Sequence, residues 1–227
     1  TLLNIENIIG STYNDSLMGS SIANKIDGGS GVDTVSYSNS NAAVSVNLGV
    51  TTAQSGGFAT GDTLFSVENI IGTALNDTLI GNGANNIIIG GAGADKMDGA
   101  AGIDTVSYAA SNAAVNVNLA LTTAQSGGHA QGDTLFNIEN IIGSSYNDTL
   151  KGTSIANIIT GGAGKDTMTG GAGADMFKYS AVADSGKVSG ARDIITDFVK
   201  GTDKIDLGDF AGSFVFKGTG AFTHTAH

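Results

Sequence analysis

The sequence contains no cysteine, proline or tryptophan, and only 10 of its 227 residues are lysine or arginine. Without cysteine, neither a disulfide framework nor a zinc site built from thiolates is possible. Nucleic acids and anionic membrane surfaces require clustered basic residues, so the 21 acidic residues against 10 basic ones argue against both as partners. No apolar run approaches the roughly 18 residues of a membrane span. The formal net charge of −11 favours cations instead.

Glycine is abundant, with 35 copies, and it recurs in units of nine residues. Each unit has Gly at place one, Asp or Asn at place six and an apolar residue at place eight. We assign the units to three blocks, at residues 4–36, 66–107 and 137–178. Two copies of one insert, 37–65 and 108–136, separate the blocks. The first block is one whole unit shorter than the other two, and a stack of equivalent turns tolerates such a difference.

Each unit predicts a turn of six residues followed by a strand of three. Glycines at places one, two and four permit the positive φ that a sharp turn needs. Because alternate strand residues face opposite sides, the side chain at place eight points inward. Two units thus make one coil of 18 residues, with two parallel strands facing each other across a narrow apolar core. The predicted fold is all-β: a parallel β-roll, which is a right-handed β-solenoid, over residues 1–178.

The side chains at place six become neighbours in space, because successive coils lie about 4.8 Å apart. Two bare carboxylates about 5 Å apart repel by roughly 3 kcal/mol at an effective dielectric constant of about 20. Calcium relieves this repulsion, since it accepts about six to eight oxygens, whereas magnesium prefers a tighter octahedron. We therefore predict about five or more calcium ions, one for each stacked pair. The pairs are Asp15 with Asp33, Asp77 with Asp95, Asn86 with Asp104, Asp148 with Asp166, and Asn157 with Asp175.

Turn glycines and further acidic residues are additional ligand candidates. The backbone carbonyls expected at these sites belong to Gly28, Gly31, Gly90, Gly93, Gly161, Gly164, Gly170 and Gly173. Weaker pairs are Glu6 over Asn24, Glu68 over Asn86 and Glu139 over Asn157, where a hydrogen bond between Glu and Asn is the alternative. Asp184 falls at the next stacked position after Asp166. Asp193 and Asp197 either join a terminal calcium site or are solvated residues of a cap.

The units GGAGADKMD, GGAGKDTMT and GGAGADMFK resemble the GGxGxDxUx nonapeptide of the RTX, or haemolysin-type, calcium-binding repeats. The tail at 177–210 resembles the C-terminal region of serralysin-type secreted proteins. This resemblance implies calcium held between stacked turns by the carboxylates at place six and by turn carbonyls. It also implies export from a Gram-negative bacterium through the type I secretion machinery, and folding in the calcium-rich extracellular medium.

Residues 179–227 are then expected to form a truncated serralysin-type cap, which stops before the strands and secretion signal that relatives generally carry. Its apolar side chains would close the open end of the roll. They are Phe198, Ile205, Leu207, Phe210, Phe214 and Phe216.

The sequence gives little support to catalysis, since it contains neither HExxH nor GxSxG. Three functions remain open: a folding and secretion module of an exported enzyme, a repeat region of a large adhesin or surface-layer protein, and a calcium-dependent module that binds polysaccharide. The inserts either continue the stack as irregular coils or cover its side. A cover would hide the outward side chains Ile87, Ile89 and Ile158, which would otherwise be free for a partner.

Overall fold

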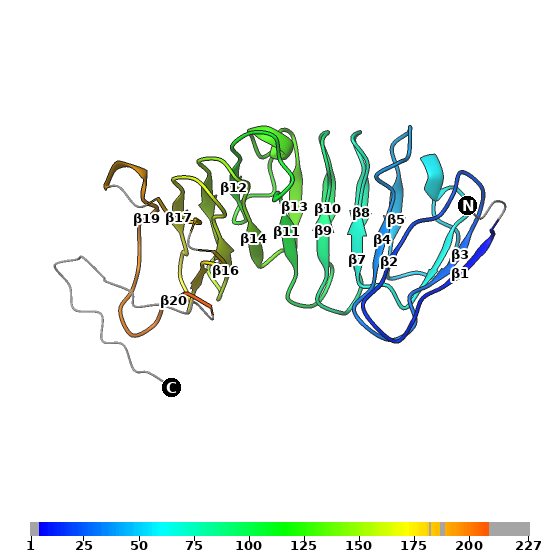
Figure 1. The fold of residues 1–227 in the computed structure, drawn as a ribbon, viewed down its shortest axis with the longest axis horizontal. Helices are drawn as coiled ribbons and strands as arrows, with labels where there is room; N and C mark the ends of the chain where they lie inside the picture. The colour runs from blue at the N-terminus through cyan, green and yellow to red at the C-terminus, as the bar shows by residue number, and fades with distance from the viewer. Residues whose placement is uncertain (1–4, 182, 187–188, 209–227) are drawn as a thin grey trace.

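The computed structural model describes residues 5–181, 183–186 and 189–208, and its short strands stack into one elongated solenoid (Figure 1). One face is a single nine-stranded parallel sheet. Its strands, in order, are β2 (Ser16–Leu17), β4 (Thr34–Ser36), β7 (Asn69–Ile71), β9 (Ile87–Ile89), β11 (Thr105–Ser107), β14 (Asn140–Ile142), β16 (Ile158–Thr160), β18 (Met176–Lys178) and β20 (Lys204–Asp206).

The opposite face is divided into three parallel sheets. The first holds β1 (Asn7–Ile9), β3 (Lys25–Asp27) and β6 (Thr63–Phe65). The second holds β5 (Ser45–Asn47), β8 (Thr78–Ile80), β10 (Lys96–Asp98) and β13 (Thr134–Phe136). The third holds β12 (Asn116–Asn118), β15 (Thr149–Lys151), β17 (Thr167–Thr169) and β19 (Ile194–Ile195). Three short 3-10 helices, η1 (Gly57–Ala59), η2 (Gly128–Ala130) and η3 (Ser189–Ala191), lie in the connections.

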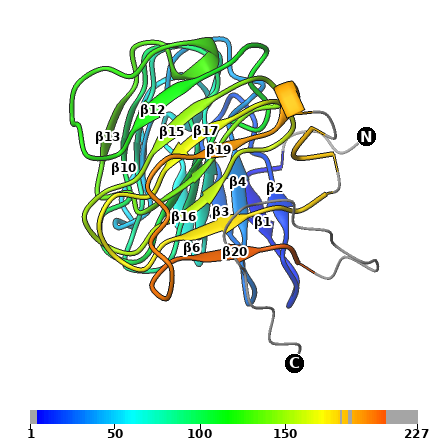
Figure 2. The ribbon, with the colours of Figure 1, turned by 90° about the vertical axis from the view of Figure 1, so that its left-hand side faces the viewer.

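Figure 2 shows the two faces of the solenoid from its end. The place-eight side chains lie between these faces and form the core. Leu79, Ile88, Met97 and Val106 are all fully buried. Leu79 stands opposite Met97 in the ladder between β8 and β10, one coil of 18 residues apart. The predicted β-roll is therefore confirmed, including its period and its inward place eight. Burying each such side chain contributes about 1.5–3 kcal/mol.

The inserts continue the stack. In the first insert β5 pairs with β8 and β6 pairs with β3, and in the second β12 pairs with β15 and β13 with β10. Each insert therefore adds two strands to the divided face. The sheets on that face separate between β6 and β5 and again between β13 and β12. Ile87 and Ile158 remain 39% exposed, so the inserts do not cover them.

The stack also continues past residue 178, because β18 pairs with β20 and β17 with β19. Ile205 stands opposite the buried Phe177, and the ring of Phe198 packs 6.3 Å from that of Phe177. These contacts support the expected closing of the core. Phe210, Phe214 and Phe216, with the rest of 209–227, lie outside the described residues.

Candidate metal centres

The side chains at place six form a ladder along each edge of the solenoid. In each predicted pair, the backbone N–H at place six of one coil donates a hydrogen bond to carboxylate Oδ1 on the next coil. The N to Oδ1 distances are 2.8 Å from Asp15 to Asp33, 2.8 Å from Asp77 to Asp95, 2.7 Å from Asn86 to Asp104, 2.8 Å from Asp148 to Asp166 and 2.9 Å from Asn157 to Asp175. The structure thus brings all five predicted pairs together.

The other carboxylate oxygen distinguishes two kinds of turn. In the turns that we call open, Oδ2 at place six is buried and has no hydrogen-bond partner among the described residues. The open turns are those of Asp33, Asp95, Asp104, Asp166 and Asp175, each at most 1% exposed. Leaving a buried carboxylate oxygen without a partner is costly. Each of these oxygens is therefore available to a cation.

In the other turns, which we call self-capped, the N–H at place two donates to the side-chain oxygen at place six. Asp77 Oδ2 accepts from Thr73 N–H at 2.6 Å, and Asn86 Oδ1 accepts from Asn82 N–H at 2.8 Å. The remaining self-capped turns are those of Asp15, Asn24, Asp148 and Asn157, capped by Ser11, Ser20, Ser144 and Thr153. Each predicted pair joins one self-capped and one open turn.

The backbone at place two explains this difference. In the open turns that residue is left-handed, with φ of 102° at Gly91 and 70° at Ala100, and the structure records no bond from its N–H to the carboxylate. The self-capped turns have Ser, Thr or Asn at place two, and none of these has positive φ. The second glycine of GGxGxD is therefore the sequence signal for an open turn. Ala100 adopts the same conformation without being glycine.

Glycine at place one leaves room for oxygens beside the open carboxylates. A Cβ built on Gly90, Gly161 or Gly170 would contact Oδ2 of Asp95, Asp166 or Asp175. A Cβ on Gly28 would meet both Asp33 Oδ2 and the Ser66 carbonyl oxygen, and one on Gly99 would meet Asp104 Oδ2 and the Asn137 carbonyl oxygen. Carboxylate and carbonyl oxygens are the ligands of calcium, so the donor set fits this ion.

Backbone carbonyls are needed in these sites. In the described part of the chain, no three His, Cys, Asp or Glu side chains are grouped so that they could hold a metal ion. The place-four glycines, Gly31, Gly93, Gly164 and Gly173, have φ of 136°, 127°, 132° and 119°. A Cβ on any of them would touch the backbone of place four on the preceding coil. They allow the coils to approach, and their role as carbonyl ligands stays a prediction.

We expect Gly91→Ala to destabilise the roll by more than about 2 kcal/mol, because alanine is strained at a φ of 102° and its Cβ would strike the Thr73 carbonyl oxygen. Gly83→Ala is the control, since a Cβ there meets nothing within 4 Å. Urea unfolding in saturating calcium measures both variants. Equal midpoints would show that position 91 tolerates a side chain as Ala100 does in its own turn.

Burial alters the acidity of the open carboxylates. It raises the pKa of Asp95 and of Asp166 to about 7 each, and backbone hydrogen bonds offset only part of this effect. The charges of Asp133 and Asp77 raise the pKa of Asp95 further. Burial also raises the pKa of Asp104 and Asp175. A nearby divalent cation would favour the ionised form and oppose these shifts.

Two of the three weaker pairs make contact through the glutamate backbone, and the pair of Glu6 and Asn24 does not. Asn86 Nδ2 donates to the Glu68 carbonyl oxygen at 2.6 Å, and Asn157 Nδ2 donates to that of Glu139 at 2.5 Å. The carboxylates of Glu68 and Glu139 point to other partners and accept from the N–H of Asp33 and Asp104, at 2.8 Å each. Asn24 Nδ2 donates to the Ile5 carbonyl, and Glu6 accepts from Lys25 N–H through its backbone oxygen.

In the tail, Asp193 and not Asp184 takes the ladder position next to Asp166. Asp193 Oδ1 accepts from Asp166 N–H at 2.9 Å, and a side-chain hydrogen bond from Tyr179 to the same carboxylate lowers its pKa, which burial raises. Asp184 instead accepts from the N–H groups of its own turn, at Ser180 and Ala181. Asp197 accepts from Gly170 and Gly171 N–H at 2.9 and 2.8 Å. The tail is one nine-residue unit longer here than the strict period predicts.

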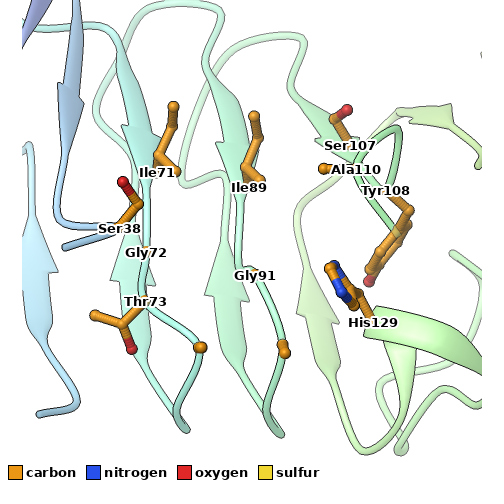
Figure 3. A pocket seen from close by; sticks show the side chains of 12 residues that line it. Ser38, Ile71, Gly72, Thr73, Ile89, Gly91, Ser107, Tyr108, Ala110 and His129 are labelled. Carbon is orange, nitrogen blue, oxygen red and sulfur yellow. The ribbon is translucent and has the colours of Figure 1, made fainter. Parts of the chain in front are cut away.

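A groove of about 320 Å³ lies on the outer side of the nine-stranded sheet and extends to Gly72 and Thr73 in the Asp77 turn and to Gly91 in the Asp95 turn. Figure 3 shows Ile71 and Ile89 on neighbouring strands, with Tyr108 and His129 of the second insert at one side. This groove bears on polysaccharide binding, the third of the functions left open by the sequence.

Comparison with protein-family models identifies the family of this chain. The family model described as Peptidase M10 serralysin C terminal matches residues 97–226, which is more than half of the sequence. The model of the RTX calcium-binding nonapeptide repeat (4 copies) matches residues 5–41 and 71–106. No curated protein matches the chain. Across the described ranges, no helix has the length and apolar character needed to span a membrane. The chain belongs to the serralysin C-terminal family of M10 peptidases and carries RTX calcium-binding nonapeptide repeats.

Proposed function

We propose that this chain is the calcium-dependent folding module of an enzyme exported by type I secretion from a Gram-negative bacterium. The observation that carries the proposal is the set of buried Oδ2 atoms without partners at the open turns. The ions would be held by the carboxylates of Asp33, Asp95, Asp104, Asp166 and Asp175, together with turn carbonyls such as those of Ser66 and Asn137. Bound calcium supplies positive charge and joins neighbouring coils.

Charge explains why such ions would control folding. Five divalent ions would bring the formal charge from −11 to about −1, which removes most of the self-repulsion of the compact state. Because the unfolded chain does not assemble these oxygens, the free energy of calcium binding becomes free energy of folding. A calcium-poor cytosol would keep the chain extended for export, and the external medium would fold it. The serralysin C-terminal and RTX matches support this order of events.

Polysaccharide binding is the second candidate, because the groove beside Tyr108 and His129 has an apolar floor of Ile71 and Ile89. Retention of the chain on a polysaccharide resin, with calcium and without it, would test this. A His129→Ala variant retained as strongly as the wild type would exclude the groove as the binding surface.

The proposed function predicts how many calcium ions each chain binds. After dialysis against calcium, the wild type should retain about five ions per chain, as measured by elemental mass spectrometry. Asp104→Asn keeps an oxygen for the ladder bond but removes the charge, so it should retain about one ion fewer. The control is Asp206→Asn, whose carboxylate accepts from Gly208 N–H after β20, outside the open turns, and should leave the count unchanged. A wild type that retains no calcium would refute the proposal.

A further inference from the structure

Two carboxylates occupy ladder positions that the nine-residue repeat does not predict. Asp62 and Asp133 lie near the ends of the two inserts and directly precede β6 and β13. Both are fully buried. Asp62 Oδ1 accepts from Asn24 N–H at 2.7 Å, and Asp133 Oδ1 accepts from Asp95 N–H at 2.8 Å. These are the contacts that every open-turn carboxylate makes with the preceding coil, so both residues are equivalent to place six.

The second oxygen of each carboxylate is satisfied by a tyrosine. Tyr37 donates its hydroxyl to Asp62 Oδ2 at 3.0 Å, and Tyr108 donates its hydroxyl to Asp133 Oδ2 at 2.9 Å. The two tyrosines are 2% and 3% exposed, so both contacts lie in the interior. The same 25-residue spacing separates tyrosine and aspartate in both inserts. At the open turns the corresponding Oδ2 has no partner.

The position of these carboxylates explains the difference. Strand β6 is the last strand of the first sheet on the divided face, and β13 is the last of the second. No carboxylate of a following coil accepts from Asp62 or Asp133; their N–H groups donate instead to the carbonyls of Ala59 and Ala130 in the 3-10 turns. A cation at these two places would lack the next coil that completes a site between stacked turns.

We propose that Tyr37 and Tyr108 take the place of calcium at the two inserts. Their hydroxyls satisfy the Asp62 and Asp133 carboxylates, so these joints, which we call the hydroxyl seals, need no metal. The inference rests on the proposed function, because it assigns which carboxylates of the ladder are calcium ligands and which are not. The seals end two of the three sheets of the divided face, and thereby separate the calcium sites on that edge into groups.

Calcium counts test the assignment of the carboxylates. Asp133→Asn should retain as many ions as the wild type, whereas Asp104→Asn should retain one fewer. Asp62→Asn asks the same question in the other insert, in case Asp133→Asn does not fold. Loss of an ion from a folded Asp62→Asn or Asp133→Asn variant would show that these carboxylates are ligands and would overturn the inference. A wild type without calcium would instead defeat the proposed function itself.

Tyrosine variants test the hydroxyl. Tyr108→Phe keeps the ring and leaves Asp133 Oδ2 without its donor, so in saturating calcium it should lower the thermal midpoint by at least about 3 °C. Tyr146→Phe is the matched control, because this ring is 46% exposed and should change the midpoint by less than about 1 °C. Tyr37→Phe should behave like Tyr108→Phe. Equal midpoints for Tyr108→Phe and Tyr146→Phe would count against the seals.

Discussion

Removal of calcium with a chelator is expected to convert the solenoid into an expanded chain. The core is one layer of place-eight side chains, and it is flanked on both edges by buried carboxylates whose Oδ2 atoms have no partner. Each stacked carboxylate pair repels by roughly 3 kcal/mol, which is comparable with the burial of one place-eight side chain. Without ions, this repulsion and the cost of the unpartnered buried oxygens add to the chain entropy lost on folding, and the narrow core should not outweigh these terms together.

Small-angle scattering and circular dichroism would measure this transition. In chelator the radius of gyration should approach the roughly 50 Å of an unfolded chain of 227 residues, and the strand signal should be lost. Millimolar calcium should restore both. Unchanged strand signal and radius in chelator would contradict the expectation.

Two controls separate a specific ion from general screening. Magnesium at the same concentration should restore little structure, because it prefers a smaller octahedral shell and retains its waters. Sodium chloride at about 1 M shortens the screening length to about 3 Å, but it supplies no ligand-bridging ion. Full recovery in either solution would show that screening of the net charge suffices.

The repeat made most of the roll predictable. Because the period is 18 residues, the pairing of Asp77 with Asp95 and the burial of Met97 followed from position alone. The same period failed in the tail, where 27 residues separate Asp166 from its ladder partner Asp193. Spacing arguments hold only where each coil has the same length.

The partners of individual oxygens could not be predicted from spacing. Asp77 and Asp95 both stand at place six, yet only Asp95 has an unpartnered oxygen, because its turn has a left-handed glycine at place two. The hydroxyl seals could not be predicted from the nine-residue repeat either. They join the first residue of an insert to an aspartate near its end, and only the folded coil brings Tyr37 to Asp62.

Acid is expected to replace calcium in part. In the folded, calcium-free chain burial raises the pKa of Asp95 and Asp166 to about 7, against an ordinary value of 3.8. The folded state therefore binds more protons than the unfolded state between about pH 4 and pH 7. Over this window the free energy of unfolding of the calcium-free chain falls as the pH rises, and the contribution of these groups is fully present only below about pH 4.

Circular dichroism in chelator should thus show more strand signal at pH 5 than at pH 8. Calcium binding should have the opposite pH dependence, because each ion must displace protons from the carboxylates. As the pH falls, the apparent affinity for calcium should decrease by up to about tenfold per pH unit for each proton displaced. The double variant Asp95→Asn/Asp166→Asn removes both titrating groups and should flatten the acid response in chelator. A strand signal that rises from pH 5 to pH 8 without calcium would show that these carboxylates are stabilised as anions by the protein alone.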